Sequence, residues 1–229
     1  MNKSKKINPR VPEGEAILDQ PEFTMEDLSK SFKKRMWEYK SFVKRIINYL
    51  ELKEHSKILE IGPGPGWITI LLAQANPTFK IIGLEISEDM IRVANDNKLE
   101  EGVGAQIEFN KGDAKDMKNF KDKSFDAVIS SDSLHHWEDP IKVFNEIHRV
   151  LRDKGKVCIK DGRRDIGIGA KIIYNIAKIF ISKTMSYYWK TSIMAGYTPD
   201  ELKEILDHSK LKDEYEIKTD LFDLIVFIK

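Results

Sequence analysis

Three glycines at alternate positions follow a short apolar run, and this arrangement constrains the fold more than any other feature of the chain. The apolar run covers residues 58–61, and the glycines are Gly62, Gly64 and Gly66. A helical pattern at residues 67–75 follows directly. Glycine lets the backbone turn sharply and approach a ligand closely, so the segment predicts a strand, a tight turn and a helix. The same turn without any ligand is the simpler alternative.

Short apolar runs and helical patterns alternate after the first 56 residues. This alternation is typical of a parallel sheet with helices on its two faces, so the fold class is α/β. An amphipathic pattern at residues 25–52 predicts one or two helices before the first strand, and a capping box at Thr198 and Glu201 predicts the start of a last helix. The seven predicted strands lie at residues 57–61, 80–84, 107–110, 125–130, 156–160, 214–218 and 222–228.

The composition favours a cytoplasmic protein. Cys158 is the only cysteine among 229 residues, so the chain forms no internal disulfide and no zinc site built from cysteines. Residues 1–25 are irregular and lack the apolar run of a secretory signal. The most apolar stretch, residues 166–181, contains Lys171 and Lys178 and is shorter than the roughly 20 residues that a membrane-spanning helix needs. We therefore expect no transmembrane segment.

Acidic residues follow two further strands at the same predicted edge of the sheet. Glu85 closes the second strand, 19 residues after Gly66, and Asp113 follows the third strand. A carboxylate at the first position can accept hydrogen bonds from both hydroxyls of a ribose, and one at the second can accept from the exocyclic amine of adenine. Since the carboxyl ends of parallel strands meet at one edge, these residues predict a nucleoside site there.

The residues around the glycines distinguish between two nucleoside cofactors. Pro63 and Pro65 have no N–H group, whereas backbone amides at a helix start normally hold the pyrophosphate of a nicotinamide dinucleotide. Glu60 would repel a diphosphate but suits the ammonium and sulfonium charges of S-adenosylmethionine. The pattern favours S-adenosylmethionine, and an NAD-dependent oxidoreductase is the alternative enzyme.

In order and spacing, these motifs resemble those of class I S-adenosylmethionine-dependent methyltransferases. The similarity covers roughly residues 57–161 and is strongest to the small-molecule group called methyltransferase type 11. It implies a Rossmann-like, mostly parallel sheet in the order 3-2-1-4-5-7-6, with the last strand antiparallel. The matching motifs are Glu60-x-Gly62-x-Gly64-x-Gly66, Glu85, Gly112-Asp113-Ala114 and the strand at residues 125–130.

The resemblance also implies a set of cofactor-binding residues. Ile86 and Met90 would contact the face of the adenine, but they also suit ordinary core packing. Asp113 would lie at the adenine edge, but it also suits a turn cap. The predicted set is Glu60, Gly62, Pro63, Gly64, Ser130 and Ser131 near the methionine part, Glu85 at the ribose, and Ile86, Met90, Asp113 and Ala114 at the adenine.

Two adjacent histidines follow the fourth strand, on the side where a methyl acceptor would bind. Methyl transfer depends mainly on holding donor and acceptor in line, so a base is needed only when the acceptor must first lose a proton. His135 and His136 are the candidates for that base, and packing is the simpler interpretation. We expect no metal site at this pair, because adjacent side chains of a helix point apart and a third ligand is not evident.

An isoleucine-rich segment with several aromatic residues follows the fifth strand. Related methyltransferases commonly insert a substrate cover here, so we expect residues 162–197 and the amino-terminal helices to form a lid. Between Arg163 and Lys190, six basic residues stand against one acidic residue, which favours an acceptor with negative charge. A solvated lysine face and a helix that rests on a lipid surface, a peripheral membrane contact, are the alternatives.

These features predict one methyltransferase domain, residues 1–229, that methylates a small molecule with S-adenosylmethionine and releases S-adenosylhomocysteine. Its predicted parts are an arm with helices (1–56), a cofactor-binding core (57–161), the lid (162–197) and the last helix and strands (198–229). A protein that binds the cofactor without turnover is the alternative from another class. An RNA substrate is not expected, because residues 130–133 lack the Asn/Asp-Pro-Pro-Tyr type of motif used on nucleobases.

Overall fold

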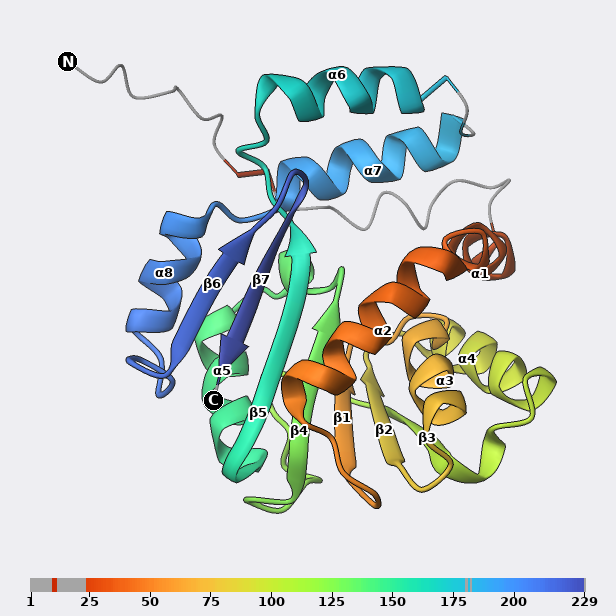
Figure 1. The fold of residues 1–229 in the computed structure, drawn as a ribbon, viewed down its shortest axis with the longest axis vertical. Helices are drawn as coiled ribbons and strands as arrows, with labels where there is room; N and C mark the ends of the chain where they lie inside the picture. The colour runs from red at the N-terminus through yellow and green to blue at the C-terminus, as the bar shows by residue number, and fades with distance from the viewer. Residues whose placement is uncertain (1–9, 12–23, 180, 182, 229) are drawn as a thin grey trace.

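A seven-stranded sheet in the order β3-β2-β1-β4-β5-β7-β6 forms the centre of the protein (Figure 1). The computed structural model describes residues 10–11, 24–179, 181 and 183–228. The strand order confirms the predicted topology, and β7 is antiparallel to β5 and β6. The strands are β1 (Lys57–Ile61), β2 (Lys80–Glu85), β3 (Ile107–Lys111), β4 (Phe125–Ser131), β5 (Leu151–Gly162), β6 (Tyr215–Thr219) and β7 (Asp223–Ile228).

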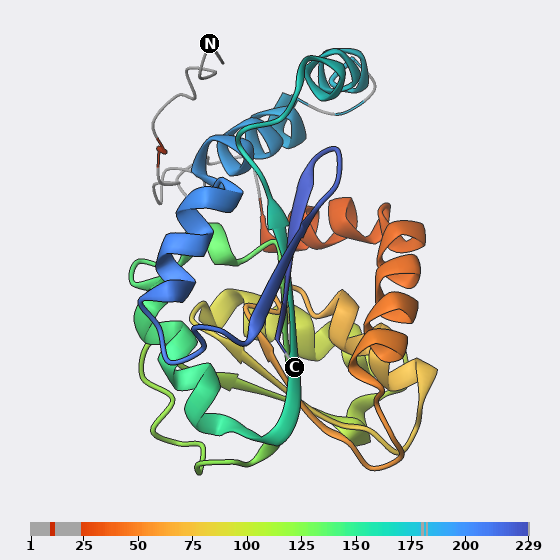
Figure 2. The ribbon, with the colours of Figure 1, turned by 60° about the vertical axis from the view of Figure 1, so that its left-hand side comes forward.

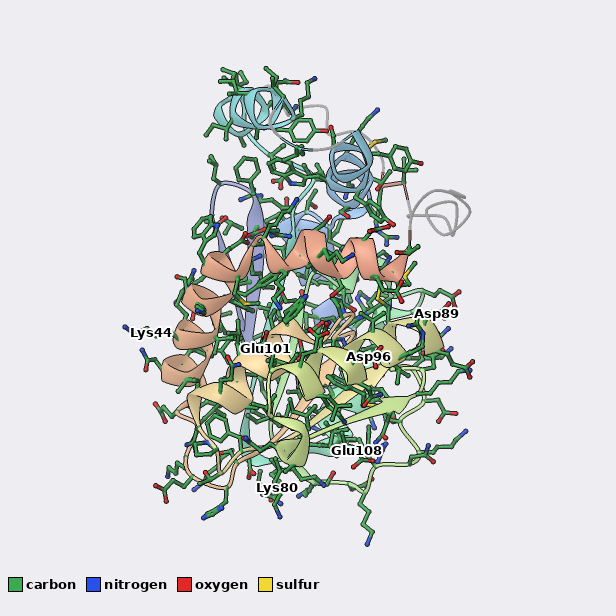
Figure 3. All side chains as sticks on the ribbon, turned by 90° about the vertical axis from the view of Figure 1, so that its right-hand side faces the viewer. Lys44, Lys80, Asp89, Asp96, Glu101 and Glu108 are labelled. Carbon is green, nitrogen blue, oxygen red and sulfur yellow. The ribbon has the colours of Figure 1, made fainter. Side chains whose placement is uncertain are left out.

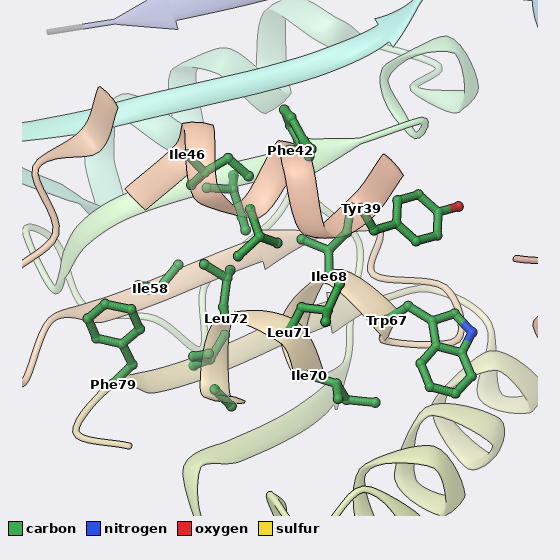
Figure 4. Packing of buried hydrophobic residues seen from close by; sticks show 14 of the residues in the cluster. Tyr39, Phe42, Ile46, Ile58, Trp67, Ile68, Ile70, Leu71, Leu72 and Phe79 are labelled. Atoms are coloured by element: carbon green, nitrogen blue, oxygen red, sulfur yellow. The ribbon is translucent and has the colours of Figure 1, made fainter. Parts of the chain in front are cut away.

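Helices cover both faces of the sheet, as predicted (Figure 2). Side chains of a strand alternate between the faces, so Ile58 of β1 packs in one core cluster and Leu59 in the other. The first cluster also contains Phe42, Ile46, Leu72 and Phe79 (Figure 4). The helices on this side are α2 (Met36–Leu50), α3 (Trp67–Ala75) and α4 (Glu88–Glu100), and those on the other side are α5 (Pro140–Val150) and α8 (Pro199–Asp207).

Side chains cap several of the helix starts. The Ser87 hydroxyl accepts a hydrogen bond from the amide of Met90 in α4. The Asp139 carboxylate accepts one from the amide of Lys142 in α5, whose first residue is a proline. Thr198 and Glu201 form the predicted capping box of α8. These caps satisfy amide groups that have no partner inside the helix, which is why the sequence signals locate the helix starts so well.

Strand β5 is longer than predicted. It runs from Leu151 to Gly162 instead of from residue 156 to residue 160, because Leu151 already pairs with Phe125 of β4, ahead of a register shift. Arg152, Asp153 and Lys154 are exposed and polar, so this part of the strand has no apolar pattern that the sequence could reveal.

The amino-terminal pattern forms two helices, α1 (Met25–Lys33) and α2, with a break at Lys34 and Arg35. Helix α1 lies over α4, whose residues Asp89 and Asp96 are labelled in Figure 3 together with Glu101 just after the helix. Of the arm predicted over residues 1–25, all but residues 10–11 and 24–25 lie outside the described residues. Among the described residues, no helix is long and apolar enough to cross a membrane.

The segment predicted as a lid contains two helices, α6 (Ile168–Ala177) and α7 (Lys183–Ala195). Both lie beyond the carboxyl end of β5, and α7 is the nearer of the two to the sheet (Figures 1 and 2). The α6–α7 hairpin therefore stands above the edge at which the sequence predicts the cofactor.

Candidate active site

The glycine turn after β1 has three residues in the left-handed region of backbone space, with φ values of 65° at Gly62, 52° at Gly64 and 81° at Gly66. A Cβ on Gly62 would lie 2.1 Å from the Ser133 hydroxyl oxygen, whereas a Cβ on Gly64 would meet nothing within 4 Å. Gly62 is thus required by packing, and Gly64 borders open space where a ligand can approach.

The third glycine has a different role. A Cβ on Gly66 would lie 2.7 Å from the Phe109 ring, and one on Gly83 of β2 would lie 2.5 Å from the same ring. Gly66 therefore makes room for a core side chain, in agreement with its burial. Only the first part of the turn faces the edge of the sheet.

The Glu85 carboxylate is held at this edge by backbone amides. It accepts hydrogen bonds from Gly64 at 3.1 Å, Ile86 at 2.9 Å and Ser87 at 3.0 Å. The carbonyl oxygen of Glu85 accepts the amide of Gly112 at 2.9 Å, which ties the segment before Asp113 to β2. The ends of β1, β2 and β3 are thus joined at Glu85, as the sequence predicted from separate motifs.

The other residues predicted at the adenine are at least partly exposed. Ile86 is 66% exposed, so core packing does not explain it, and Met90, Asp113 and Ala114 are half-buried. Asp113 does cap a turn, since its Oδ1 accepts a hydrogen bond from the amide of Lys115 at 2.9 Å. Its Oδ2 lies 3.5 Å from Lys115 Nζ and can still accept a hydrogen bond from a ligand. The exposed Ile86 side chain suits the apolar face of an adenine, and the Glu85 carboxylate beside it suits the diol of a ribose.

The two serines at the end of β4 differ. The Ser130 hydroxyl donates to the carbonyl of Ile61 at 2.8 Å and is buried, so it joins β4 to the start of the glycine turn. The buried Ser131 hydroxyl has no hydrogen-bond partner among the residues described. A buried polar atom of this kind calls for a partner, and a bound ligand at the strand end can supply one. The residues present therefore fit the predicted cofactor.

Glu60 is a buried residue of β1, two positions before Gly62. Its carboxylate accepts a short hydrogen bond from the Thr69 hydroxyl of α3, and it is only 2% exposed. Burial raises the pKa of Glu60 to about 7, an effect that Thr69 opposes and the nearby charge of Glu85 reinforces. Glu60 thus joins β1 to α3, and its charge depends on pH near neutrality.

This raised pKa predicts a pH-dependent stability. The ordinary value is 4.5, so the folded protein binds the proton of Glu60 more tightly than the unfolded chain does. The stabilisation of the folded protein by this bound proton is complete below about pH 4.5 and is lost as the pH rises to about 7.

Glu60→Gln, which carries no charge at any pH, should therefore raise the free energy of unfolding at pH 8 by roughly 1–2 kcal/mol. Denaturant unfolding at pH 5 and pH 8 measures this, and the exposed strand residue Glu108 supplies the control Glu108→Gln. Equal pH dependence of the wild type and Glu60→Gln would contradict the prediction.

His135 and His136 lie in the short 3-10 helix Leu134–His136 after β4. The buried Asp161 carboxylate, at the end of β5, accepts the amide of His135 at 2.7 Å and contacts its Nδ1 at 2.7 Å. His136 is exposed. The expectation that the two rings point apart is wrong, because their centroids are 4.0 Å apart; the 3-10 turn places neighbouring side chains differently from an α-helix.

Sequence reasoning missed Asp161, although a signal was present. An acidic residue closes the apolar strand β5 just as Glu85 closes β2, and its partner His135 had already been singled out. In the described part of the chain, no group of three His, Cys, Asp or Glu residues is placed to hold a metal ion.

A buried charge cluster beside the site was also missed. Lys160 of β5 lies 3.6 Å from Asp132, 3.2 Å from Asp223 and 3.6 Å from Glu38 of α2. Burial alone would raise the pKa of Asp132, but Lys160 and Arg35 hold it below its ordinary value. These residues are far apart in sequence, so only the fold brings them together.

Helix α1 is fastened to the glycine turn by buried polar contacts. Asn97 of α4 donates to the Ser29 hydroxyl at 3.0 Å and to the Pro65 carbonyl at 2.8 Å. The Trp67 indole donates to the Ser29 carbonyl at 3.1 Å. These contacts hold helix α1 against α3, α4 and the glycine turn.

The two arginines at the start of the lid are engaged in ion pairs. Arg163 bonds to Asp165 at 2.6 and 2.7 Å, and Arg164 bonds to Glu201 of α8 at 2.6 Å. Arg10 of the arm donates to the carbonyls of His135 at 2.6 Å and Ala195 at 2.7 Å. Arg10 and Arg164 thus tie residues 162–197 to the arm and to α8, and the positive charge that remains in this segment comes from its exposed lysines.

Comparisons with known proteins agree with this geometry. A family model described as a methyltransferase domain matches residues 59–159. The 27-O-demethylrifamycin SV methyltransferase of Amycolatopsis mediterranei is 34% identical over 117 residues, and the match spans 51% of this chain and 42% of that protein. The demethylmenaquinone methyltransferase of Lactobacillus johnsonii is 29% identical over 188 residues, spanning 78% of this chain and 77% of that one.

A solved structure shares the fold. A Methanococcus maripaludis protein, crystallised as a candidate S-adenosyl-L-methionine-dependent methyltransferase, has a TM-score of 0.71 at 22% identity, and the match covers 92% of this chain and 95% of that one. The sheet order, the glycine turn and the acidic strand ends define a class I S-adenosylmethionine-dependent methyltransferase. More narrowly, residues 59–159 form a methyltransferase type 11 domain, and its cofactor is S-adenosylmethionine, with S-adenosylhomocysteine as the product.

Proposed function

We propose that this protein transfers the methyl group of S-adenosylmethionine to a small-molecule acceptor at the carboxyl edge of the sheet. The observation that carries the proposal is the Glu85 carboxylate, fixed by three backbone amides beside the open side of Gly64. The two relatives named above act, by their names, on small molecules. When bound, the cofactor supplies a methyl group on a positively charged sulfur that is already a good leaving group.

In this proposal each predicted residue has a defined task. Glu85 accepts the ribose hydroxyls, Ile86 and Met90 cover the adenine, and Asp113 with Ala114 borders its edge. Gly62, Pro63 and Gly64 border the methionine part, with Glu60 behind them supplying negative charge. Ser131, whose buried hydroxyl lies at the end of β4, donates to the same part, and Ser130 keeps that strand end in place.

Calorimetric titration tests the cofactor, and product formation tests turnover. We expect S-adenosylmethionine and S-adenosylhomocysteine to bind and NAD to show no heat. Methylated product from a screen of phenolic, quinone and anionic metabolites would exclude a binding protein without turnover. Binding of NAD alone would overturn the proposal, and methylation of RNA alone would overturn its acceptor class.

The expectation of a negatively charged acceptor depends on the basic residues of the segment 162–197. An anionic acceptor was expected from its basic residues, but Arg163 and Arg164 already neutralise carboxylates of this chain. Lys171 and Lys178 belong to α6 and its end, and α7 lies between α6 and the sheet, so these lysines do not border the acceptor position. We propose a cytoplasmic enzyme whose acceptor is recognised mainly by shape.

The histidines give a prediction about proton removal. His136 is exposed above the strand ends, whereas His135 is 3% exposed and held by Asp161. If the acceptor must lose a proton, His136 takes it and the His135–Asp161 pair positions the loop. His136→Ala should then lower kcat about 100-fold while leaving the melting temperature unchanged. His135→Ala should lower the melting temperature, because it leaves the buried Asp161 without its imidazole partner. An unchanged kcat for His136→Ala would show that no base acts at this position.

A further inference from the structure

Helix α6 presents isoleucines to the solvent. Ile168 is 73% exposed, Ile172 and Ile176 are 55% exposed, and Ile179 just beyond the helix is 74% exposed. Their spacing of three and four residues places them on one side of the helix, which we call the isoleucine face. Ala170, on another side, is fully buried. An apolar surface of this kind on a folded protein marks an interaction site.

The surroundings of this face are positively charged. From Ile166 to Pro199 the sequence contains no Asp or Glu and four lysines, Lys171, Lys178, Lys183 and Lys190. Lys171, Lys178 and Lys190 are exposed, and within the described residues no ion pair reaches them. The acidic residues that flank this stretch are Asp165, which is bonded to Arg163, and Asp200 at the start of α8, which is followed by Glu201, the partner of Arg164. Within its own length, the hairpin therefore offers cations without competing anions.

The hairpin is fixed with this face outward. The ring of Tyr174 packs edge-on against Trp189 at 5.0 Å, and Trp189 contacts Phe222 of the β6–β7 turn at 5.7 Å. The Tyr174 hydroxyl donates to the carbonyl of Ser186 at 3.3 Å. Helix α6 is the outermost element at this end of the molecule, with α7 between it and the sheet (Figures 1 and 2).

We propose that the isoleucine face of α6 docks on an anionic lipid surface. Bulky apolar side chains with lysines at their flank suit a helix lying in the headgroup region, where the isoleucines enter the acyl boundary and the lysines reach lipid phosphates. A second copy is a poor occupant, because two acid-free, lysine-rich faces would repel each other. Docking in this way turns the carboxyl edge of the sheet, and with it the cofactor site, toward the lipid. The proposal concerns a surface separate from the cofactor residues, so it does not rest on the proposed function.

Vesicle co-sedimentation of the full chain tests the proposal. The probes are vesicles of phosphatidylcholine alone and of phosphatidylcholine with an equal part of phosphatidylglycerol. We expect binding to the second only, weakened by salt. Ile172→Glu/Ile176→Glu should lower the affinity by about 100-fold or more, because both side chains would have to bring charge into the acyl boundary. Leu99→Glu is the matched control, since Leu99 is an equally exposed apolar residue on α4 (68%), and it should bind like the wild type.

A second variant tests the charge. Lys171→Gln/Lys178→Gln should lower the affinity for anionic vesicles by about 25-fold, that is about fivefold for each lysine. Calorimetric binding of S-adenosylhomocysteine should be unchanged in every variant, which shows that each is folded. The proposal is overturned if the wild type stays in the supernatant or if the double glutamate variant still binds. It is equally overturned if the isoleucine face proves to hold a second copy or another protein, seen in sedimentation equilibrium as an assembly that this variant abolishes.

Discussion

Glu85→Ala should weaken the binding of S-adenosylmethionine about 100-fold, measured by calorimetric titration. The Glu85 carboxylate is held toward the edge of the sheet by three amides, and it provides the acceptor oxygens for the ribose hydroxyls. Hydrogen bonds to a charged acceptor are about twice as strong as neutral ones, so loss of two is costly. Alanine also releases the amide of Gly64, which loosens the glycine turn itself.

Two variants separate binding from folding in this experiment. Glu85→Gln keeps the size of the side chain and one acceptor oxygen, so its affinity should lie between those of the wild type and Glu85→Ala. Asp89→Ala removes an exposed carboxylate from the first turn of α4 and should leave the affinity unchanged (Figure 3). If Glu85→Ala binds the cofactor as well as Asp89→Ala does, the ribose assignment is wrong.

Gly62→Ala should lower the free energy of unfolding by roughly 3 kcal/mol. The φ of 65° is already unfavourable for a residue with a Cβ, at a cost of roughly 1 kcal/mol. The new Cβ would also lie 2.1 Å from the Ser133 hydroxyl oxygen and 2.7 Å from the Ser133 Cβ. The loop after β4 would have to move, and with it the helix that carries His135 and His136.

Gly64→Ala is the matched control for this prediction. Its φ of 52° is similar, but a Cβ there meets nothing within 4 Å. We therefore expect a loss of only about 1 kcal/mol, measured by the same denaturant unfolding. The double variant Gly62→Ala/Ser133→Gly should recover part of the loss, because it removes both overlapping atoms. Equal losses for the two single alanine variants would show that backbone strain, and not the contact with Ser133, decides the effect.

The fold could be predicted from the sequence because its signals are local. Alternating apolar runs mark the strands, and capping residues such as Ser87 and Thr198 mark the helix starts. The start of strand β5 was not predicted, because the exposed polar residues Arg152, Asp153 and Lys154 lie in a register shift between the pairs of Leu151 and Lys156 and show no apolar pattern. The division into four parts stays a prediction.

The candidate site could be predicted only in part. Glu85 and the glycines follow strands directly, so parallel topology alone brings them together. The Asp161–His135 pair and the cluster around Lys160 depend on loop conformations and on the position of α2. Likewise, no sequence pattern showed that Arg164 forms an ion pair with Glu201, because the packing of α8 brings these two residues together.

Phe109 lies against two glycines that belong to different segments, and this has an evolutionary consequence. The space filled by its ring is the space that a Cβ on Gly66 or Gly83 would need. The three positions should therefore change together: a family member with a side chain at either glycine position should carry a smaller residue in place of the phenylalanine. A glycine kept at the position of Gly66 is then explained by the packing of the core against Phe109. It gives no information about which ligand the turn binds.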